Sequence, residues 1–200
     1  MRRSEFEVKD KSYFEELLKI SEYGVLSLND DGKTYSVPVN FAHEDSKIFI
    51  HGAIDGRKYK LIENNKNGSF LVVRPFSYIP STFSKTDLAC PATQFFASTI
   101  CEGEITILKD EIQKAKALNI LMRKFQDEGS FLDIEKHIKK YKNMLDKTAV
   151  FCFEIKNWSL KVKVGQNMKD EKIDNFISEL EKSGRYIDKL TIEQIKKFTS

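Results

Sequence analysis

The spacing of apolar residues predicts a helix followed by a run of strands in the first part of the chain. Apolar side chains recur at helical spacing over residues 10–20, where a helix is expected. From residue 24 the period changes to two, which predicts strands on both sides of a turn at 30–32 and a further strand over 47–52. Together, residues 24–52 are predicted to form a β-meander.

The middle of the chain continues this strand-rich pattern. A glycine-containing turn after residue 52 leads into a short predicted helix, and residues 68–74 have the composition of a strand. Residues 75–92 contain three of the four prolines and many Ser and Thr residues, which predicts a long irregular loop. The stretch 93–108 is typical of a strand, and Gly103 is expected to mark a bulge that bends it around a barrel corner.

Helical spacing returns in the second half of the chain. Helices are predicted over 110–125 and 131–145, and residues 148–164 are predicted to form two strands with a break near Asn157. Beyond residue 165 we expect two more helices. The last of these is predicted to begin at Thr191, the first residue of a capping box.

This order of elements predicts the α+β fold class. Six or seven mostly antiparallel strands in hairpin order, with helices between and after them, fit a small β-barrel with flanking helices and a C-terminal helical extension. We therefore expect a barrel domain over residues 1–165 and the helical extension over residues 166–200.

The composition narrows the classes of function. The chain of 200 residues is 40% hydrophobic and 32% charged, with a net charge of +3. These values fit a folded domain and give no strong field for binding nucleic acid or a membrane surface. The Lys-rich helical segments alternate in sign with acidic residues, as solvated helix faces do. No apolar run approaches the roughly 20 residues of a membrane span.

Targeting and redox signals favour a cytoplasmic protein. The first residues lack the apolar stretch of a secretory signal, and the three cysteines are an odd number without CxxC spacing, so free thiols are expected. Cys101 and Cys152 fall in predicted strands, where core packing is their expected role. The three histidines, His43, His51 and His137, lack the spacing of a metal site, so no metal is expected.

The stretch that carries most chemical information is 50–58. A strand ends there, Gly52 and Gly56 allow the backbone to turn tightly, and Arg57 and Lys58 stand at the start of a helix. A helix N-terminus with two adjacent cations favours a bound phosphate. The same residues also fit an ordinary turn followed by solvated basic side chains.

Two further residues stand out. Pro38 lies inside a predicted strand, and because proline removes a ladder hydrogen bond, that strand is expected to be an edge or to be interrupted. An interrupted strand would leave backbone groups available for a ligand. Trp158, the only tryptophan, can stack on a planar ligand or pack against the core.

The order of several motifs resembles one known family. These motifs are an N-terminal Met-Arg-Arg, YGVLSLNDDGKTYSVPVNF at 23–41, KIFIHGAIDGRK at 47–58, Glu102-Gly103-Glu104, and NWSLK at 157–161. The sequence is similar to the pyridoxamine 5′-phosphate oxidase-like flavin-binding split barrels, and within them to the nitroimidazole-resistance (Nim) type. The resemblance covers about residues 1–164 and is most specific in the segment HGAIDGRK.

The resemblance implies a six-stranded split barrel that forms a homodimer, with FMN, or FAD in some members, between the subunits. The flavin phosphate is implied at Arg57 and Lys58, with Gly56 beside them. His51 and Gly52 belong to the HGA motif at the site. The strand implied to pass beside the flavin ring holds Val37, Pro38, Val39 and Asn40.

Three more contacts are implied near the ends of later strands. Ser98 takes the place of a family serine that follows Tyr-Arg, although Phe96 and Ala97 precede it here. Trp158 and Lys161 match the tryptophan and lysine of the family segment WSGK, in which this chain replaces the glycine by leucine.

For a Nim-type protein, the resemblance implies a flavin-dependent oxidoreductase. Its substrate would be small, planar and electron-poor, such as a 5-nitroimidazole, with His51 orienting the substrate or supplying a proton. Two alternatives stay open. The chain can be a flavin-binding or storage module without turnover, or a haem-binding split barrel with His51 or His137 as axial ligand.

Overall fold

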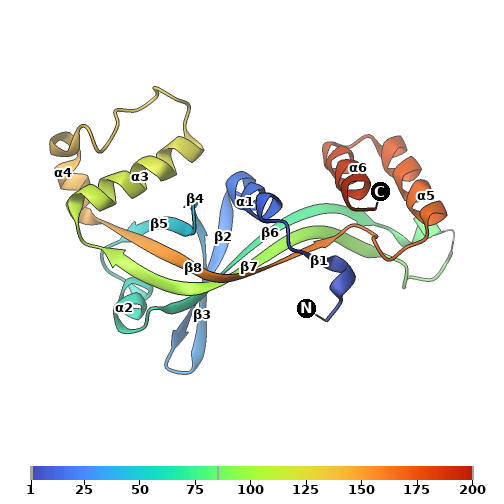
Figure 1. Ribbon diagram of the computed structural model, residues 1–200, viewed down its shortest axis with the longest axis horizontal. Coiled ribbons are helices and arrows are strands. Elements are labelled where there is room, and N and C mark those ends of the chain that lie inside the picture. The colour runs from blue at the N-terminus through green and yellow to red at the C-terminus, as the bar shows by residue number, and fades with distance from the viewer. Residues whose placement is uncertain (1, 85, 200) are drawn as a thin grey trace. The chain divides into compact units, whose positions relative to one another are not determined.

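The computed structural model describes residues 2–84 and 86–199, which form an α+β protein built on one open antiparallel sheet (Figure 1). The strands are β1 (Glu7–Val8), β2 (Tyr23–Asp30), β3 (Lys33–Asn40), β4 (Ala42–Glu44), β5 (Lys47–Ala53), β6 (Asn67–Ile79), β7 (Thr93–Leu108) and β8 (Thr148–Lys163). Their order in the sheet is β3-β2-β6-β7-β8-β5-β4, and β1 pairs with β8. The sheet has two free edges, β3 and β4, which fits the predicted split barrel.

The helices lie near their predicted positions, although the one expected over 131–145 begins only at Ile138. They are α1 (Lys11–Ile20), α2 (Arg57–Asn64), α3 (Glu111–Phe125), α4 (Ile138–Lys147), α5 (Asp170–Ser183) and α6 (Tyr186–Thr199), with short 3₁₀ turns η1 (Ser4–Phe6) and η2 (Ser81–Ser84). Gly184 ends α5 in the left-handed conformation, as glycine does at many helix ends. The predicted start of the last helix at Thr191 is wrong. Thr191 lies inside α6, where its hydroxyl donates to the carbonyl of Ile187 at 2.7 Å.

The predicted meander over residues 24–52 is also wrong. β2 and β3 form one hairpin at one edge of the sheet order, and β4 and β5 form a second hairpin at the other edge. β2 then pairs with β6, and β5 pairs with β8. Both hairpins have the local alternation that the sequence shows. Local alternation does not indicate which later strand pairs with each hairpin, because that pairing is long-range.

Three other boundaries differ from the prediction. β6 runs to Ile79 and buries Phe76, Ser77 and Ile79, so the loop predicted over 75–92 begins only after residue 79. β8 is one continuous strand without a break at Asn157. Gly103 is explained by close approach of two strands, because a Cβ atom there would lie 2.0 Å from the carbonyl oxygen of Glu154.

The chain comprises two compact units, described separately below. Unit 1 contains residues 2–10, 73–84, 86–99 and 159–199, and unit 2 contains residues 11–72 and 100–158. The helices α5 and α6 belong to unit 1 together with β1. The predicted boundary at residue 165 stays a prediction.

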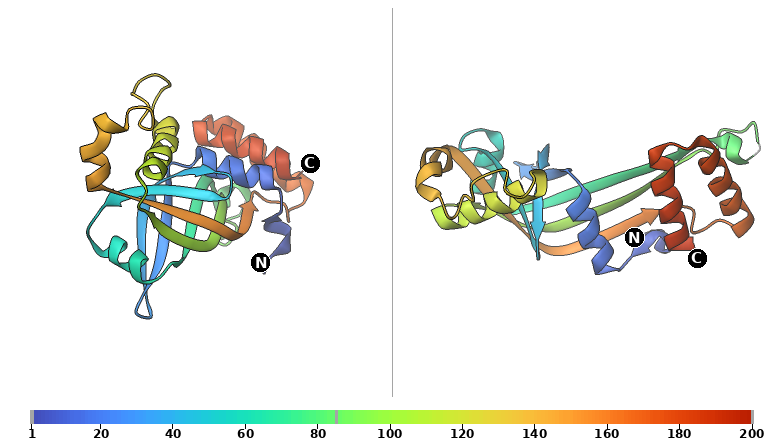
Figure 2. Two further views of the ribbon diagram at one scale, coloured as in Figure 1. Left: turned by 60° about the vertical axis from the view of Figure 1, so that its left-hand side comes forward. Right: turned by 90° about the horizontal axis from the view of Figure 1, so that it is seen from above.

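Unit 2 has an aromatic core between its strands. The rings of Phe41 and Phe70 pack edge to face with centroids 5.0 Å apart, and Phe153 lies 6.1 Å from Phe70. All three side chains are fully buried. Helix α3 packs on β4, β5 and α4 (Figure 2). Cys101 and Cys152 are buried, as predicted, and Cys90 of unit 1 is exposed. None of these three described cysteines forms a disulfide.

Unit 1 has its own core beneath the C-terminal helices. Phe176 of α5 is fully buried, and its ring lies 6.1 Å from Phe83 and 6.4 Å from Phe95. Alternate residues of β8, Leu160 and Val162, are also fully buried, as their predicted common face requires. Helices α5 and α6 pack side by side within this unit (Figure 2).

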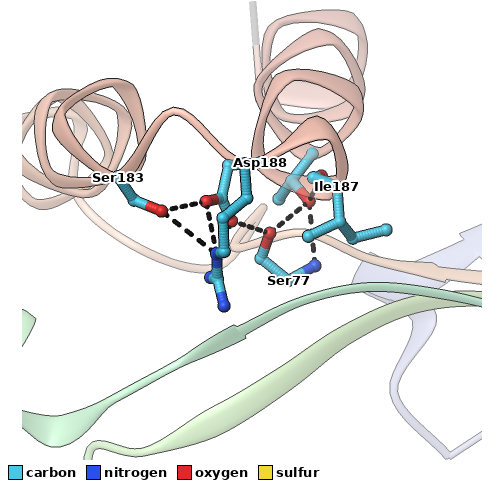
Figure 3. Close-up of polar contacts among 6 residues, drawn as sticks. Ser77, Ser183, Ile187 and Asp188 are labelled. Atoms are coloured by element: carbon cyan, nitrogen blue, oxygen red, sulfur yellow. Dashed lines mark hydrogen bonds and ion pairs between the residues drawn. The ribbon is translucent and has the colours of Figure 1, made fainter.

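A buried carboxylate joins α6 to β6 within unit 1 (Figure 3). Asp188 accepts from the Ser77 hydroxyl at 2.5 Å and from the Arg185 guanidinium at 2.8 and 2.9 Å, and the Ser183 hydroxyl also donates to it. Its side chain is 0% exposed. Beside this carboxylate, the backbone N–H of Ser77 donates to Thr191 at 2.8 Å. These bonds satisfy a charge that would be costly to bury alone.

No helix in the described part of the chain is long and apolar enough to cross a membrane.

Candidate functional site

The predicted phosphate site lies where β5 turns into α2, within unit 2. Gly56 has φ 109°, a conformation that glycine adopts readily, and it precedes α2 without a capping side chain. The first helical hydrogen bond runs from the Lys60 N–H to the Gly56 carbonyl at 3.2 Å. The N–H groups before it, those of Arg57 to Tyr59, have no acceptor inside the helix. This helix N-terminus is therefore open to an anion.

Arg57 is positioned by the β2–β3 hairpin. Its Nε and Nη2 atoms donate to one carboxylate oxygen of Asp30 at 2.8 and 2.5 Å. Its guanidinium carbon lies 4.6 Å from the ring centroid of Tyr35. Sequence reasoning missed both partners, because only the hairpin brings them next to α2. The ion pair is partly exposed, so its main effect is to orient the guanidinium rather than to add stability.

Lys58 is a half-buried cation without an ionic partner. Its Nζ atom lies 3.4 Å from the carbonyl oxygen of His51 and 5.1 Å from the ring centroid of Phe151. It takes part in no ion pair among the described residues. Burial lowers the pKa of Lys58 below its ordinary value. A buried ammonium with no counter-ion is costly, and a bound anion would offset that cost.

Gly52 leaves the space that the Lys58 side chain occupies. A Cβ atom at Gly52 would lie 2.9 Å from the Lys58 Nζ atom and 3.3 Å from its Cε atom. Gly52 sits on β5, opposite Ala149 of β8. Because Gly52 of the HGA segment has no side chain, Lys58 can lie beside β5. The spacing of the motif alone did not reveal this reason for a glycine.

His51 is exposed on β5, opposite Val150 of β8. Partial desolvation and then the nearby ammonium of Lys58 lower the pKa of His51 below its ordinary value. The imidazole is consequently neutral at neutral pH. In this state it can donate one hydrogen bond and accept another.

The predicted strand beside the flavin ring, β3, is an edge strand, which confirms the interpretation of Pro38. Pro38 is exposed and faces Val25 of β2, whereas Val39 is buried and Val37 is half-buried. The side-chain amide of Asn40 donates to the carbonyl of Glu22 at 3.2 Å. Because Arg57 lies over Tyr35 of the same strand, the structure brings β3 and the start of α2 together.

The remaining predicted contacts are placed differently. Trp158 stacks on Phe14 of α1, with ring centroids 4.4 Å apart and an interplanar angle of 14°. The structure thus shows the packing role that the sequence left open, and the flavin contact of Trp158 stays a prediction. Ser98 and Lys161 belong to unit 1, where both are half-buried, and their flavin contacts also stay predictions.

The described residues hold no group of three His, Cys, Asp or Glu side chains that could bind a metal ion.

The sequence decides the family. A family model described as pyridoxamine 5′-phosphate oxidase matches residues 10–162. This chain belongs to the pyridoxamine 5′-phosphate oxidase family. The match includes β2 to β8 almost entirely, together with the whole of α2. No curated protein sequence matches the chain.

Solved structures of this architecture agree with the family assignment. A candidate 5-nitroimidazole antibiotic resistance protein from Bacteroides thetaiotaomicron VPI-5482 is similar with a TM-score of 0.63 and 21% identity, covering 78% of this chain and 86% of that one. The flavocytochrome Anf3 from Azotobacter vinelandii is similar with a TM-score of 0.65 and 18% identity, covering 84% of this chain and 75% of that one. An FAD and heme binding protein from Mycobacterium smegmatis is similar with a TM-score of 0.65 and 17% identity, covering 84% of this chain and 78% of that one. These likenesses establish a shared fold.

Proposed function

We propose that this member of the pyridoxamine 5′-phosphate oxidase family binds a flavin, FMN in the first instance. Its phosphate would lie at the N-terminus of α2, held by Arg57, Lys58 and the free backbone N–H groups. The observation that carries the proposal is Lys58, a half-buried cation with no ionic partner among the described residues, beside an uncapped helix start. A doubly charged phosphate supplies what both features lack.

The flavin ring would lie along β3. This strand ends the sheet, so one side of its backbone has no strand partner, and Pro38 removes one donor there. Arg57 links the two parts of the site, because its guanidinium is held between Asp30 and the ring of Tyr35. FAD is the alternative flavin, and a homodimer with the flavin between subunits is the assembly that we propose from the family resemblance.

The proposed activity is that of a cytoplasmic oxidoreductase acting on a small, planar, electron-poor substrate such as a nitroimidazole. Similarity to the candidate resistance protein from Bacteroides supports this choice of substrate class. A bound flavin supplies hydride or electron transfer. Within the chain, His51 is the group that we expect to contact the substrate. Because its lowered pKa keeps it neutral, it would orient the substrate by a hydrogen bond.

The first experiment is a visible spectrum of the protein purified without added cofactor, followed by identification of what denaturation releases. Flavin bands with release of FMN support the proposal, and release of FAD would change only the cofactor's identity. A Soret band would instead favour haem, which two of the similar structures are named for. A colourless protein that also fails to bind added FMN or FAD would refute flavin binding.

Variants of α2 test the phosphate contact itself. Lys58→Met removes the half-buried ammonium and is expected to weaken FMN binding about tenfold or more, as loss of a charged hydrogen bond does. Lys60→Met removes the same charge from the same helix, at an exposed lysine that pairs with Asp55 at 3.6 Å, and is the matched control. Equal losses in both variants would contradict the site.

Gly52→Ala is a subtler test, because it keeps every charge. Its Cβ atom must displace the Lys58 ammonium, which lies 2.9 Å from that position. We expect weaker FMN binding with an unchanged melting temperature of the apoprotein. Unchanged FMN affinity would show that Lys58 does not hold the phosphate from its present position.

A turnover experiment separates the oxidoreductase from the storage module. The flavin bound to the protein is reduced chemically without oxygen and mixed with a 5-nitroimidazole, and its reoxidation is followed by visible absorbance. An enzyme should reoxidise faster than free reduced FMN, and His51→Gln should slow this step. Reoxidation no faster than that of free FMN would favour the storage module.

A further inference from the structure

Unit 1 contains a small basic cavity, and of its lining residues only Lys161 is also an implied flavin contact. Its volume is about 250 Å³, and it is lined by Arg2, Arg3, Phe6, Phe96, Lys161 and Lys163. Four of these six residues are cations and the other two are aromatic, so the lining contains no carboxylate. The whole chain carries a net charge of only +3, which makes this local concentration of charge unusual for the molecule.

The fold gathers these residues from opposite ends of the sequence. The strand β1 pairs with β8, so that Glu7 faces Lys161 and Val8 faces Leu160. The 3₁₀ turn η1 precedes β1 and is closed by a hydrogen bond from the Phe6 N–H to the Arg3 carbonyl at 3.3 Å. Phe6 is 2% exposed and anchors this turn. The two N-terminal arginines are thereby held next to the last residues of β8.

The cations lie over the two aromatic rings. The Arg3 guanidinium is 5.9 Å from the centroid of Phe6, and the Lys161 ammonium is 5.7 Å from Phe6 and 5.3 Å from Phe96. Such contacts stabilise a cation only weakly at partly exposed sites and do not neutralise its charge. Lys163 donates to the hydroxyl of Thr93, which is also uncharged.

None of the four cations has an acidic partner in the part of the chain that the structure describes. Even Glu7, directly across the ladder from Lys161, forms no ion pair with it. Burial, then the charges of Lys161 and Arg3, lower the pKa of Lys163. Like charges held this close destabilise one another unless an anion joins them.

We propose that this cavity is a second anion site, which binds the phosphate or pyrophosphate group of a small organic phosphate. The planar guanidinium groups of two arginines and the compact ammonium groups of two lysines can donate hydrogen bonds to phosphate oxygens. The volume suits a phosphate or pyrophosphate group with a small attachment, and the rest of a nucleotide-sized ligand would lie outside it. All residues that line this cavity belong to unit 1, whereas the proposed flavin phosphate site on α2 belongs to unit 2.

The test uses isothermal titration calorimetry on the flavin-loaded protein, so that the start of α2 is already filled. Inorganic pyrophosphate, AMP and adenosine are the probes, at low and at moderate salt. We expect saturable binding of pyrophosphate and AMP, weakened by salt, and no binding of adenosine. Equal binding of adenosine and AMP would overturn the assignment, because it would show recognition of the base.

Two variants locate the site. Arg2→Gln with Arg3→Gln is expected to weaken pyrophosphate binding about tenfold or more, since each change removes charged donors. Lys9→Gln with Lys189→Gln removes the same charge from exposed positions of unit 1 and should have little effect. Lys163→Met, on β8, provides a second test in case the arginine variant detaches the N-terminal segment from β8. Lys161 is left unchanged, because it is also an implied flavin contact.

Two results would refute the site. One is absence of saturable pyrophosphate binding to the parent protein, and the other is an equal loss in the Lys9/Lys189 control. Repeating the titration with Lys58→Met separates this proposal from the flavin proposal. Retained pyrophosphate binding there with lost FMN binding supports two independent sites, whereas loss of pyrophosphate binding would assign it to α2.

Discussion

The buried carboxylate of Asp188 makes unit 1 sensitive to acid in a way that can be worked out in advance. Burial on its own raises the pKa of Asp188, but hydrogen bonds from Arg185, Ser183 and Ser77 outweigh it and lower the pKa from 3.8 to about 2. Each pKa unit corresponds to about 1.4 kcal/mol, so the ionised carboxylate contributes about 2 kcal/mol to the folded state.

The sign of this contribution follows from the direction of the pKa change. A carboxylate with a lowered pKa in the folded state stabilises it above the unfolded value of 3.8. That stability is lost as the pH falls toward 2, and about half of it remains near pH 3. Asp188→Asn keeps the shape but removes the charge, and it turns an N–H group toward donors that the carboxylate accepts from.

Urea unfolding followed by circular dichroism measures the effect. We expect Asp188→Asn to lower the free energy of unfolding by about 2 kcal/mol at neutral pH, and its difference from the parent protein to shrink by about half near pH 3. Asp174→Asn, at an exposed carboxylate of α5, is the control and should change stability by no more than about 0.5 kcal/mol. A difference that does not depend on pH would refute the role of the charge.

Three further predictions concern unit 2. Gly103→Ala places a Cβ atom 2.0 Å from the Glu154 carbonyl oxygen and should destabilise the protein by about 1–3 kcal/mol, and an unchanged melting temperature would contradict the close approach of the two strands. Phe14→Ala removes the ring stacked on Trp158 and should cost about 3 kcal/mol with a red shift of the emission of this single tryptophan, whereas an unshifted spectrum would argue against the stack. A phosphate bound at α2 would offset the charge of the Lys58 ammonium, which contributes to lowering the pKa of His51. Proton NMR should therefore show that the pKa of His51 rises when inorganic phosphate or FMN is added. An unaltered titration of His51 would place the anion elsewhere.

Local patterns predicted most of the elements correctly. The change from helical to alternating spacing located α1, the β2–β3 hairpin and the strand 93–108, because each depends on neighbours within a few residues. The turn into α2 also depends on local sequence, where Gly56 and the adjacent cations indicated a candidate anion site beside the alternative of an ordinary turn. Pro38 correctly indicated an edge strand, since the lost donor excludes a central position.

The errors in the bounds of single elements are local, but the larger errors and omissions are long-range. The sequence could not show that the hairpins of residues 24–52 separate to opposite edges of the sheet, since that depends on pairing with β6 and β8. Nor could it show that Asp30 and Tyr35 orient Arg57, because they are far from it along the chain. Trp158 had two open roles, and only the tertiary structure showed that it packs against α1.

The sequence by itself indicated the α+β class of the protein and a candidate anion site at the start of α2, because periodicity, proline and glycine act through local backbone geometry and the cations lie side by side in the chain. Only the tertiary structure decided that Lys58 is half-buried without an ionic partner among the described residues, that Gly52 makes room for it, and that residues 2–3 meet residues 161–163 around a basic cavity. Those facts depend on which strands pair and what burial does to a charge, and neither is encoded in any short stretch of sequence.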